Sequence, residues 1–260
     1  MKAKKLHRLR AGFIAFASLA VVIGASEQGS AASARWKPDE LAKALANPSR
    51  PQTDRDRDAE RKPAQLMNFL GIERGMTAVD IIAANGYLTE VLSITVGPKG
   101  KVYLQNPAMM LQMRDGALGK AVEERLAGKR LPNVVRVDGD VSSLPPGSAD
   151  AAITAMNFHD LYNMGGAPAG QALMKDVYTV LKPGGVFGVI DHVGNDGADN
   201  KELHRIPKHV AIEAAKAAGF VVEAESDLYA NPADDHTKQV RDPSVRGKTD
   251  QFLLRLRKPK

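Results

Sequence analysis

The stretch from Met76 to Leu92, MTAVDIIAANGYLTEVL, constrains the fold of this chain more than any other. Ala78–Ile82 is a short apolar run that favours a strand and holds one acid, Asp80. A tight turn with a single glycine, Gly86, follows, and the next apolar residues take helical spacing at Leu88, Val91, Leu92 and Thr95. A strand, a tight turn and a helix form the opening unit of a nucleotide-binding α/β domain, in which the positive helix end faces a ligand.

The rest of the sequence predicts further strand–helix units added to this one. Strands are expected at residues 101–105, 134–137, 151–155, 186–190, 220–223 and 251–257, and the segment Met156–Gly170, with three glycines, is expected to be irregular. The last two strands have no helix between them. We therefore expect an α/β fold with one doubly wound, seven-stranded, mostly parallel sheet and an antiparallel edge strand.

Residues 35–75 are expected to form a helical lead-in to the α/β domain of residues 76–260. Within the lead-in, Asp54–Lys62 (DRDRDAERK) alternates in charge almost residue by residue. Such a run is typical of a solvated helix face with pairs at i and i+4, and a binding patch is the alternative.

The amino terminus has the pattern of a secretory signal peptide. Five basic residues precede an uncharged, mostly apolar run at Ala11–Ala25, and Ala32-Ser33-Ala34 supplies small residues for cleavage after Ala34. The apolar run is shorter than the roughly 20 residues that span a bilayer, so an exported, periplasmic protein is favoured over an uncleaved membrane anchor.

Removal of residues 1–34 would also remove most of the net charge of +6. That segment holds five Lys or Arg residues and one Glu, which leaves 31 basic and 29 acidic residues, a net charge of +2. The basic isoelectric point is therefore no argument for nucleic-acid binding. The chain has no cysteine, which excludes disulfides, thiolate metal sites and a cysteine nucleophile.

Several stretches of the sequence resemble a known family. Leu181–Gly185 (LKPGG) and Gly139–Asp150 (GDVSSLPPGSAD) are similar to segments of class I S-adenosylmethionine-dependent methyltransferases. More narrowly, the chain resembles a group of exported, predicted methyltransferases of bacteria, in the ordered stretches RDAERKPAQ, GYLTEVL, GPKGKVY, NFHDLY, LKPGGVFGVIDH, LHRI, AAGF, NPADDH and RGKTDQF. These stretches cover most of the chain from Arg57 onwards.

The resemblance implies S-adenosylmethionine as the cofactor and a set of residues around it. The class carries an acid followed by G-x-G-x-G, whereas this chain has Asp80-Ile81-Ile82-Ala83-Ala84-Asn85-Gly86, with one glycine left. Where the class places a ribose-binding acid after the second strand, this chain has Asn106, and Asp140 matches the residue that meets adenine. The expected cofactor-binding residues are Asp80, Ala84, Asn85, Gly86, Asn106, Asp140 and Asn157.

Two pairs of histidine and acid follow neighbouring strands at the edge where such sheets bind ligands. His159 and Asp160 follow the fourth predicted strand, and Asp191 and His192 end the fifth. His159 is the candidate general base, with Asp160, Asp191 and His192 in support, and a packed or capping histidine is the alternative. A metal site is not expected, because the spacing matches no zinc or iron pattern.

These residues lead to two hypotheses for the function. The first is transfer of a methyl group from S-adenosylmethionine to an oxygen or nitrogen of a small molecule. The second is a methyltransferase fold that has lost activity and binds a ligand in the periplasm, which the reduced glycine turn and the expected export favour. The long polar segment before the last strand is expected to be either a lid or a solvated loop.

Overall fold

The computed structural model describes Met1 and residues 35–260, so the expected signal peptide lies outside the described residues. Residues 35–260 belong to one compact unit, in which the lead-in and the α/β domain are not separate. Among the described residues, no helix is both long enough and apolar enough to cross a membrane.

A seven-stranded sheet forms the centre of this unit, in the order β3-β2-β1-β4-β5-β7-β6. Its strands are β1 (Thr77–Ile81), β2 (Lys101–Asn106), β3 (Val134–Asp138), β4 (Ala149–Ala155), β5 (Leu181–His192), β6 (Val221–Ser226) and β7 (Gln251–Arg257). The first five are parallel, and β7 runs antiparallel between β5 and the edge strand β6. The predicted seven-stranded, mostly parallel sheet with antiparallel pairing at one edge is confirmed.

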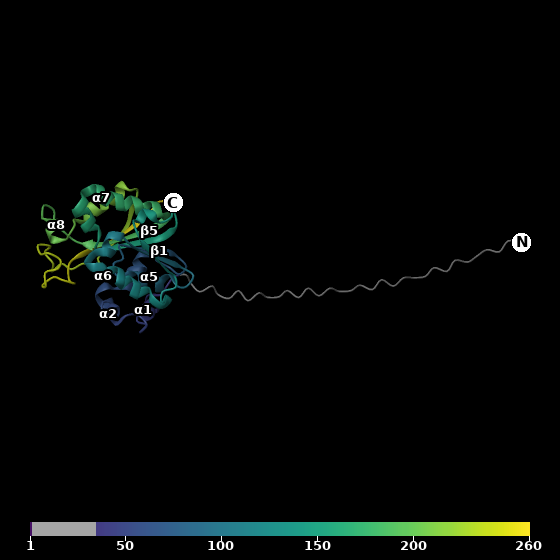
Figure 1. The fold of residues 1–260 in the computed structure, drawn as a ribbon. Coiled ribbons are helices and arrows are strands. Elements are labelled where there is room, and N and C mark those ends of the chain that lie inside the picture. The colour runs from purple at the N-terminus through teal and green to yellow at the C-terminus, as the bar shows by residue number, and fades with distance from the viewer. Residues whose placement is uncertain (2–34) are drawn as a thin grey trace. The chain divides into compact units, whose positions relative to one another are not determined.

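Helices cover both faces of the sheet (Figure 1). They are α1 (Pro38–Leu45), α2 (Gln52–Arg55), α3 (Asp58–Arg61), α4 (Pro63–Leu70), α5 (Tyr87–Val96), α6 (Ala108–Leu126), α7 (Phe158–Val180), α8 (Asn200–Leu203) and α9 (Lys208–Ala217), with short 3-10 turns η1 (Ala127–Lys129) and η2 (Val141–Ser143). Alternate residues of β1 serve opposite faces, because side chains alternate along a strand. Val79 belongs to the core cluster that includes residues of α7 and α9, whereas Ala78 belongs to the cluster that includes residues of α1, α4 and α5.

The segment Met156–Gly170 is not irregular, as the sequence had suggested, because α7 starts at Phe158. Only Gly166 departs from helical geometry, with φ +66° and ψ −165°. Pro168 falls in the first turn after that break, where a missing N–H costs nothing. The buried Phe158 and His159 fix the start of the helix at the end of β4. The glycines and the proline therefore kink one helix instead of replacing it with a loop.

Candidate active site

The turn after β1 keeps a left-handed backbone at three alternate positions. Ile82, Ala84 and Gly86 have φ angles of +54°, +50° and +83°, and they occupy the three glycine positions of the G-x-G-x-G pattern. Such angles cost a non-glycine residue about 1–3 kcal/mol, and they are rarest for a β-branched residue such as Ile82. The geometry of the motif has thus been kept although two of its glycines are replaced.

Side chains from the neighbouring strands hold this turn in place. The Gln105 side-chain oxygen Oε1 accepts from the Ile82 N–H (3.0 Å), and the Asn106 side-chain oxygen Oδ1 accepts from the Ala84 N–H (2.9 Å). The Asn106 amide nitrogen in turn donates to the Ala84 carbonyl (3.0 Å), and Asn157 donates to the Ile82 carbonyl (3.3 Å). Hydrogen bonds to fixed, buried partners can maintain a strained backbone. Asn106 lies where the class has its ribose acid, and here its amide binds the turn.

Arg125 of α6 joins the turn to three other parts of the chain. Its guanidinium lies 2.7 Å from Asp54 and 2.6 Å from Glu90 of α5, and its Nε donates to the Asn85 carbonyl. All three charged groups are buried. The interpretation of Asp54–Lys62 as a solvated face is therefore wrong for Asp54, because its partner lies 71 residues further along the chain.

The helix that follows the turn begins with Tyr87, whose ring is surrounded by arginines. Its hydroxyl donates to Asp58 (2.7 Å), which also accepts from Arg50. Arg57 and Arg61 lie over the ring, 4.9 and 5.7 Å from its centre. The segment Asp54–Lys62, whose charge alternation suggested a solvated face, therefore places the guanidinium groups of Arg57 and Arg61 beside the turn after β1.

A cavity of about 210 Å³, here called the turn cavity, opens against this turn. Four of the seven expected cofactor residues line it, namely Asp80, Ala84, Asn85 and Asn157. Gly86 caps α5 beside them, and Asn106 is buried against the turn. Asp140 is exposed after β3, at the same edge of the sheet. Burial raises the pKa of Asp80 to about 7, against the hydrogen bond that it accepts from Thr89.

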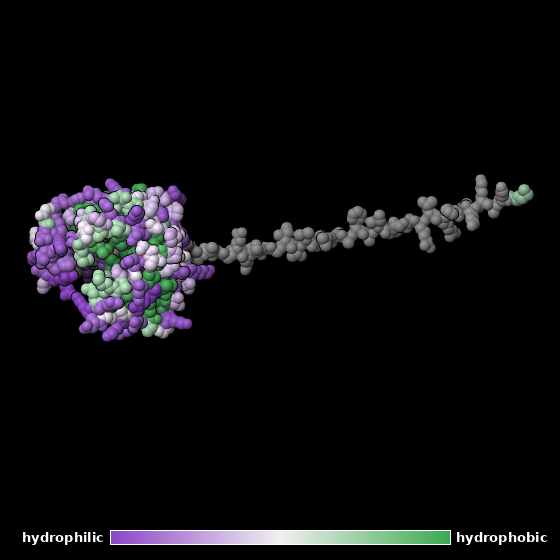
Figure 2. Space-filling model, turned by 45° about the horizontal axis from the view of Figure 1, so that its top comes forward, coloured by the Kyte–Doolittle hydropathy of each residue, from purple (hydrophilic) through white to green (hydrophobic). Residues whose placement is uncertain are grey.

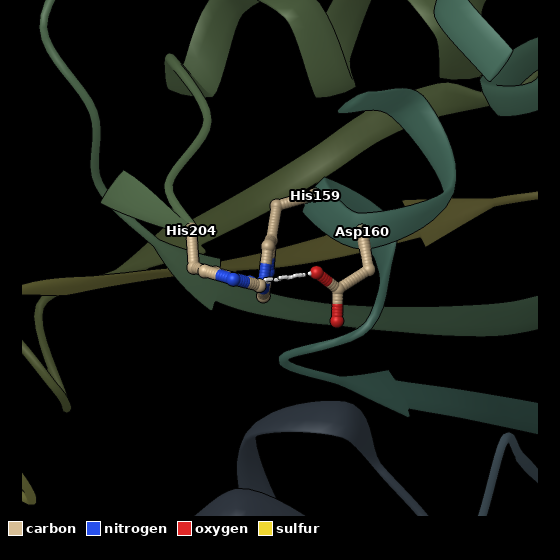
Figure 3. A group of neighbouring side chains, drawn as sticks. All are labelled: His159, Asp160 and His204. Carbon is tan, nitrogen blue, oxygen red and sulfur yellow. Dashed lines mark hydrogen bonds and ion pairs between the residues drawn. The ribbon is translucent and has the colours of Figure 1, made fainter. Parts of the chain in front are cut away.

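The expected catalytic residues meet at the ends of β4 and β5. The fully buried Asp191 accepts hydrogen bonds from the backbone N–H groups of His159 and His192. Its Oδ1 also lies 2.6 Å from the ring nitrogen Nδ1 of His159. This bond orients the His159 ring and leaves its Nε2 facing Asp160, at 3.2 Å. Figure 3 shows Asp160 and His204 converging on His159, with Asp160 2.9 Å from Nδ1 of His204.

The two histidines that follow β4 and end β5 differ in charge. Burial alone would lower the pKa of His159, but its bonds to Asp160 and Asp191 outweigh burial and raise it to about 9. Burial lowers the pKa of His192 to about 4. At neutral pH His159 is therefore an imidazolium that donates hydrogen bonds, whereas His192 is neutral. The role of general base that the sequence suggested for His159 requires a proton to leave it first.

A second and larger cavity, here called the histidine cavity, has a volume of about 560 Å³. His159, Asp160, His192 and His204 line one part of it, and the loop before β7 contributes Arg241 and Arg246. Arg61 and Met156 line the histidine cavity, the turn cavity and a third cavity of about 250 Å³. The three cavities therefore adjoin one another along the carboxyl edge of the sheet, where ligands bind in such folds.

His159, Asp160 and His204 are also the residues that could hold a metal ion, since one ligand atom from each lies within 4.8 Å of the others. Asp191 lies 2.6 Å from Nδ1 of His159 and would orient the ring so that Nε2 faced the ion. The surroundings oppose a cation, however, because the Arg241 guanidinium lies 3.4 Å from Nε2 of His204. Hydrogen bonds from both histidines also occupy Asp160.

The long segment between β6 and β7 is fixed to the domain by a buried ion pair. Arg205 lies 2.9 and 3.0 Å from the two carboxylate oxygens of Asp234, and it donates to the Val193 carbonyl. His236 lies 3.0 Å from Asp250. These contacts give the NPADDH stretch a structural role and position the arginines that follow it.

The sequence analysis missed several residues of this site. Arg57, Arg61 and Met156 were not identified, nor were Arg241 and Arg246. The family-like stretches RDAERKPAQ and RGKTDQF were a signal for Arg57, Arg61 and Arg246, whereas Met156 and Arg241 lie in none of these stretches. Neither charge alternation nor loop polarity distinguishes a site from a surface.

The strain in the turn is testable by substituting its two neighbouring alanines. Ala84→Gly should leave the free energy of unfolding unchanged or raise it by up to about 1 kcal/mol, because glycine accepts a positive φ without cost. Ala83→Gly, at a position without positive φ, should lower it by about 1 kcal/mol. Urea denaturation measures both, and an equal loss in the two variants would contradict the strain.

The charge on His159 is testable through the pH dependence of stability. The folded pKa of about 9 lies above the unfolded value of 6.5, so this stabilisation is complete below pH 6.5 and is lost as the pH rises through 9. The difference in unfolding free energy between the wild type and His159→Gln should therefore be larger near pH 6 than near pH 10. The exposed His209→Gln is the control, and a difference that stays constant with pH would contradict the assignment.

Comparison with known proteins gives local similarity to methyltransferases. No family model matches the chain. It is 41% identical over 85 residues to sterol 24-C-methyltransferase of Debaryomyces hansenii, which is 26% of this chain and 22% of that enzyme. It is 26% identical over 122 residues to demethylmenaquinone methyltransferase of Geobacillus stearothermophilus, which is 46% of this chain and 47% of that enzyme. The chain thus matches less than half the length of either curated relative.

Solved structures share the fold over a larger part of the chain. A SAM-dependent methyltransferase from Aquifex aeolicus aligns with a TM-score of 0.57 at 21% identity, over 86% of this chain and all of that one. The [4+2]-cyclase SpnF aligns with a TM-score of 0.56 at 17% identity, over 77% of this chain and 81% of that one. The solved structures show that the chain has the class I methyltransferase fold, and the curated relatives that it resembles locally are methyltransferases.

Proposed function

We propose that this protein transfers a methyl group from S-adenosylmethionine to a small-molecule acceptor. The observation that carries the proposal is the turn after β1, which keeps three left-handed positions and opens onto a cavity that adjoins the histidine cavity. A site for two small molecules needs two such neighbouring spaces, one for the methyl donor and one for the acceptor.

The residues of the turn cavity fit S-adenosylmethionine. The α-carboxylate of the cofactor would accept hydrogen bonds from Arg57 and Arg61. Its ammonium group would donate to Asp80 and to the Asn157 amide oxygen. Asp140 stands after β3, two strands from β1 at the same edge of the sheet, where the class binds adenine. When bound, the cofactor supplies an electrophilic methyl group, whose transfer breaks its bond to sulfur and forms one to the acceptor atom.

In this proposal the histidine cavity binds the acceptor and aligns it. At neutral pH the imidazolium of His159 is held by Asp191 at Nδ1 and by Asp160 at Nε2, so it places a positive charge beside the acceptor and is not itself a base. As the pH approaches 9, His159 loses its proton and becomes able to act as a base. His192, neutral and fixed by Thr249 at 2.8 Å, lies beside it. The cavity volume suits a small molecule, and the curated relatives are named for sterol and demethylmenaquinone substrates.

Cofactor binding is testable by calorimetric titration of the purified protein with S-adenosylhomocysteine. Micromolar binding is expected, and Gly86→Val should abolish it, because a Cβ there would lie 2.8 Å from Arg125 and 3.1 Å from Leu104. Gly147→Val is the matched control: its φ is also positive, at +60°, but no atom lies within 4 Å of the added Cβ. A folded protein that shows no binding at millimolar ligand would contradict the proposal.

We also propose that the protein is exported after cleavage behind Ala34. The support is the sequence pattern, in which five basic residues precede the uncharged, mostly apolar run Ala11–Ala25 and Ala32-Ser33-Ala34 supplies small residues for cleavage. Directly after this position, the Trp36 indole donates to the Thr95 carbonyl at 2.7 Å, and Arg35 pairs with Glu73.

Export predicts a mature protein that begins at Arg35 in the periplasmic fraction of a bacterial host. Intact-mass measurement of that fraction checks the cleavage position. Substitution of Ala32 and Ala34 by bulky residues should leave the uncleaved chain with the membrane. Full-length protein in the cytoplasmic fraction of the wild type would contradict export.

A further inference from the structure

The histidine cavity carries more positive than negative side chains. Arginines from two distant segments line it, and the two carboxylates that line it are Glu60 and Asp160; the arginines are Arg57, Arg61, Arg241 and Arg246. Asp191 stands behind the cavity and balances the charge of His159. The four guanidinium groups therefore exceed the two carboxylates by two charges.

None of these four arginines makes an ion pair or a side-chain hydrogen bond with an acid among the described residues. Arg57 and Arg61 lie over the ring of Tyr87, and Glu60 attracts the charge of Arg61 without forming an ion pair with it. The Arg241 guanidinium lies 3.4 Å from Nε2 of His204, and Arg246 makes no side-chain hydrogen bond or ion pair in the described part of the chain. Elsewhere in the described chain, the buried arginines form ion pairs. Arg50 pairs with Asp58, Arg125 with Asp54 and Glu90, and Arg205 with Asp234. The arginines that line the histidine cavity therefore differ from these buried arginines in having no carboxylate partner.

An unpaired guanidinium is ordinary on an open surface, which accounts for the exposed Arg241 and Arg246 taken alone. Arg57 and Arg61 are both partly buried, and they lie four positions apart in the sequence. Burial lowers the pKa of Arg61, and the charge of Arg57 lowers it further. Two like charges withdrawn from water raise the free energy of the empty cavity, and a bound anion would relieve that cost.

We propose that the acceptor substrate is a small oxyanion, with a carboxylate or phosphate group that these arginines bind. The planar guanidinium matches both groups through paired N–H···O bonds. This inference rests on the proposed function, in that it takes the histidine cavity as the acceptor site. The side of the molecule that carries α8 and the loop before β7 is predominantly hydrophilic in Figure 2.

Substitution of Arg246 tests acceptor binding independently of cofactor binding. Arg57 and Arg61 also line the turn cavity, where the cofactor carboxylate would reach them, but Arg246 lines only the histidine cavity of the three. Arg246→Gln should therefore weaken the binding of an anion and leave the affinity for S-adenosylhomocysteine unchanged. Lys216→Gln, an exposed residue of α9, is the control for loss of one positive charge.

The experiment is calorimetry on the protein saturated with S-adenosylhomocysteine, titrated in turn with benzoate, phenyl phosphate and the neutral isostere benzamide. At least one of the two anions should bind, with benzamide at least about 10-fold weaker. Arg246→Gln and Arg241→Gln, both at residues that line only the histidine cavity of the three, should each weaken the anion about 10-fold, and Lys216→Gln should not. Preference for benzoate or for phenyl phosphate then distinguishes a carboxylate substrate from a phosphate.

Equal binding of benzamide and the anions would overturn the inference, as would no anion binding at millimolar concentration. Anion affinity that survives both arginine substitutions would also overturn it. Failure of S-adenosylhomocysteine to bind is a separate result, which contradicts the proposed function alone. The same titrations without it then still test whether the cavity binds oxyanions.

Discussion

The buried guanidinium of Arg125 is the interaction on which the site depends most. It binds Asp54 of the lead-in, Glu90 of α5 and the Asn85 carbonyl of the turn, so it connects four parts of the chain. Loss of one partner from such a buried set leaves a charge without compensation, which typically costs about 3–5 kcal/mol. The same side chain lies against Gly86, which explains why a glycine is required there.

The turn can be understood from this contact. Gly86 needs to be glycine for two reasons, a positive φ and the absence of space for a Cβ. At Ile82 and Ala84 only the first reason, a positive φ, applies. There the backbone N–H groups donate to the Gln105 and Asn106 side chains, and these hydrogen bonds hold the backbone in place. A sequence with one glycine of three can therefore keep the shape of the motif, and the loss of glycines is weak evidence for loss of the site.

Much of the fold was predictable because strand and helix periodicity is local. All seven strands and the edge of the sheet that carries His159 and Asp191 follow from short patterns. The start of α7 did not, because its first turn depends on burial of Phe158 in the core. The role of Asp54 depends on Arg125, which no pattern in the neighbouring sequence indicates. The charge state of His159 depends on two carboxylates that only the folded chain brings together.

The site as a whole combines a conformation suited to a cofactor with a cavity suited to an acceptor. Arg61 and Met156 stand at the junction of the two, so a ligand in one cavity meets a ligand in the other. The lead-in supplies Arg57 and Arg61, which makes residues 35–75 part of the site and not only a cover for α5.

The central claim is that the turn after β1 is a cofactor site in spite of its missing glycines. A crystal structure of the protein with S-adenosylhomocysteine tests it most directly. The account predicts ligand density in the turn cavity, beside Ala84–Gly86 and within reach of Arg57 or Arg61, with Ile82 and Ala84 still left-handed. Density elsewhere, or a turn that must refold to admit the ligand, would contradict it.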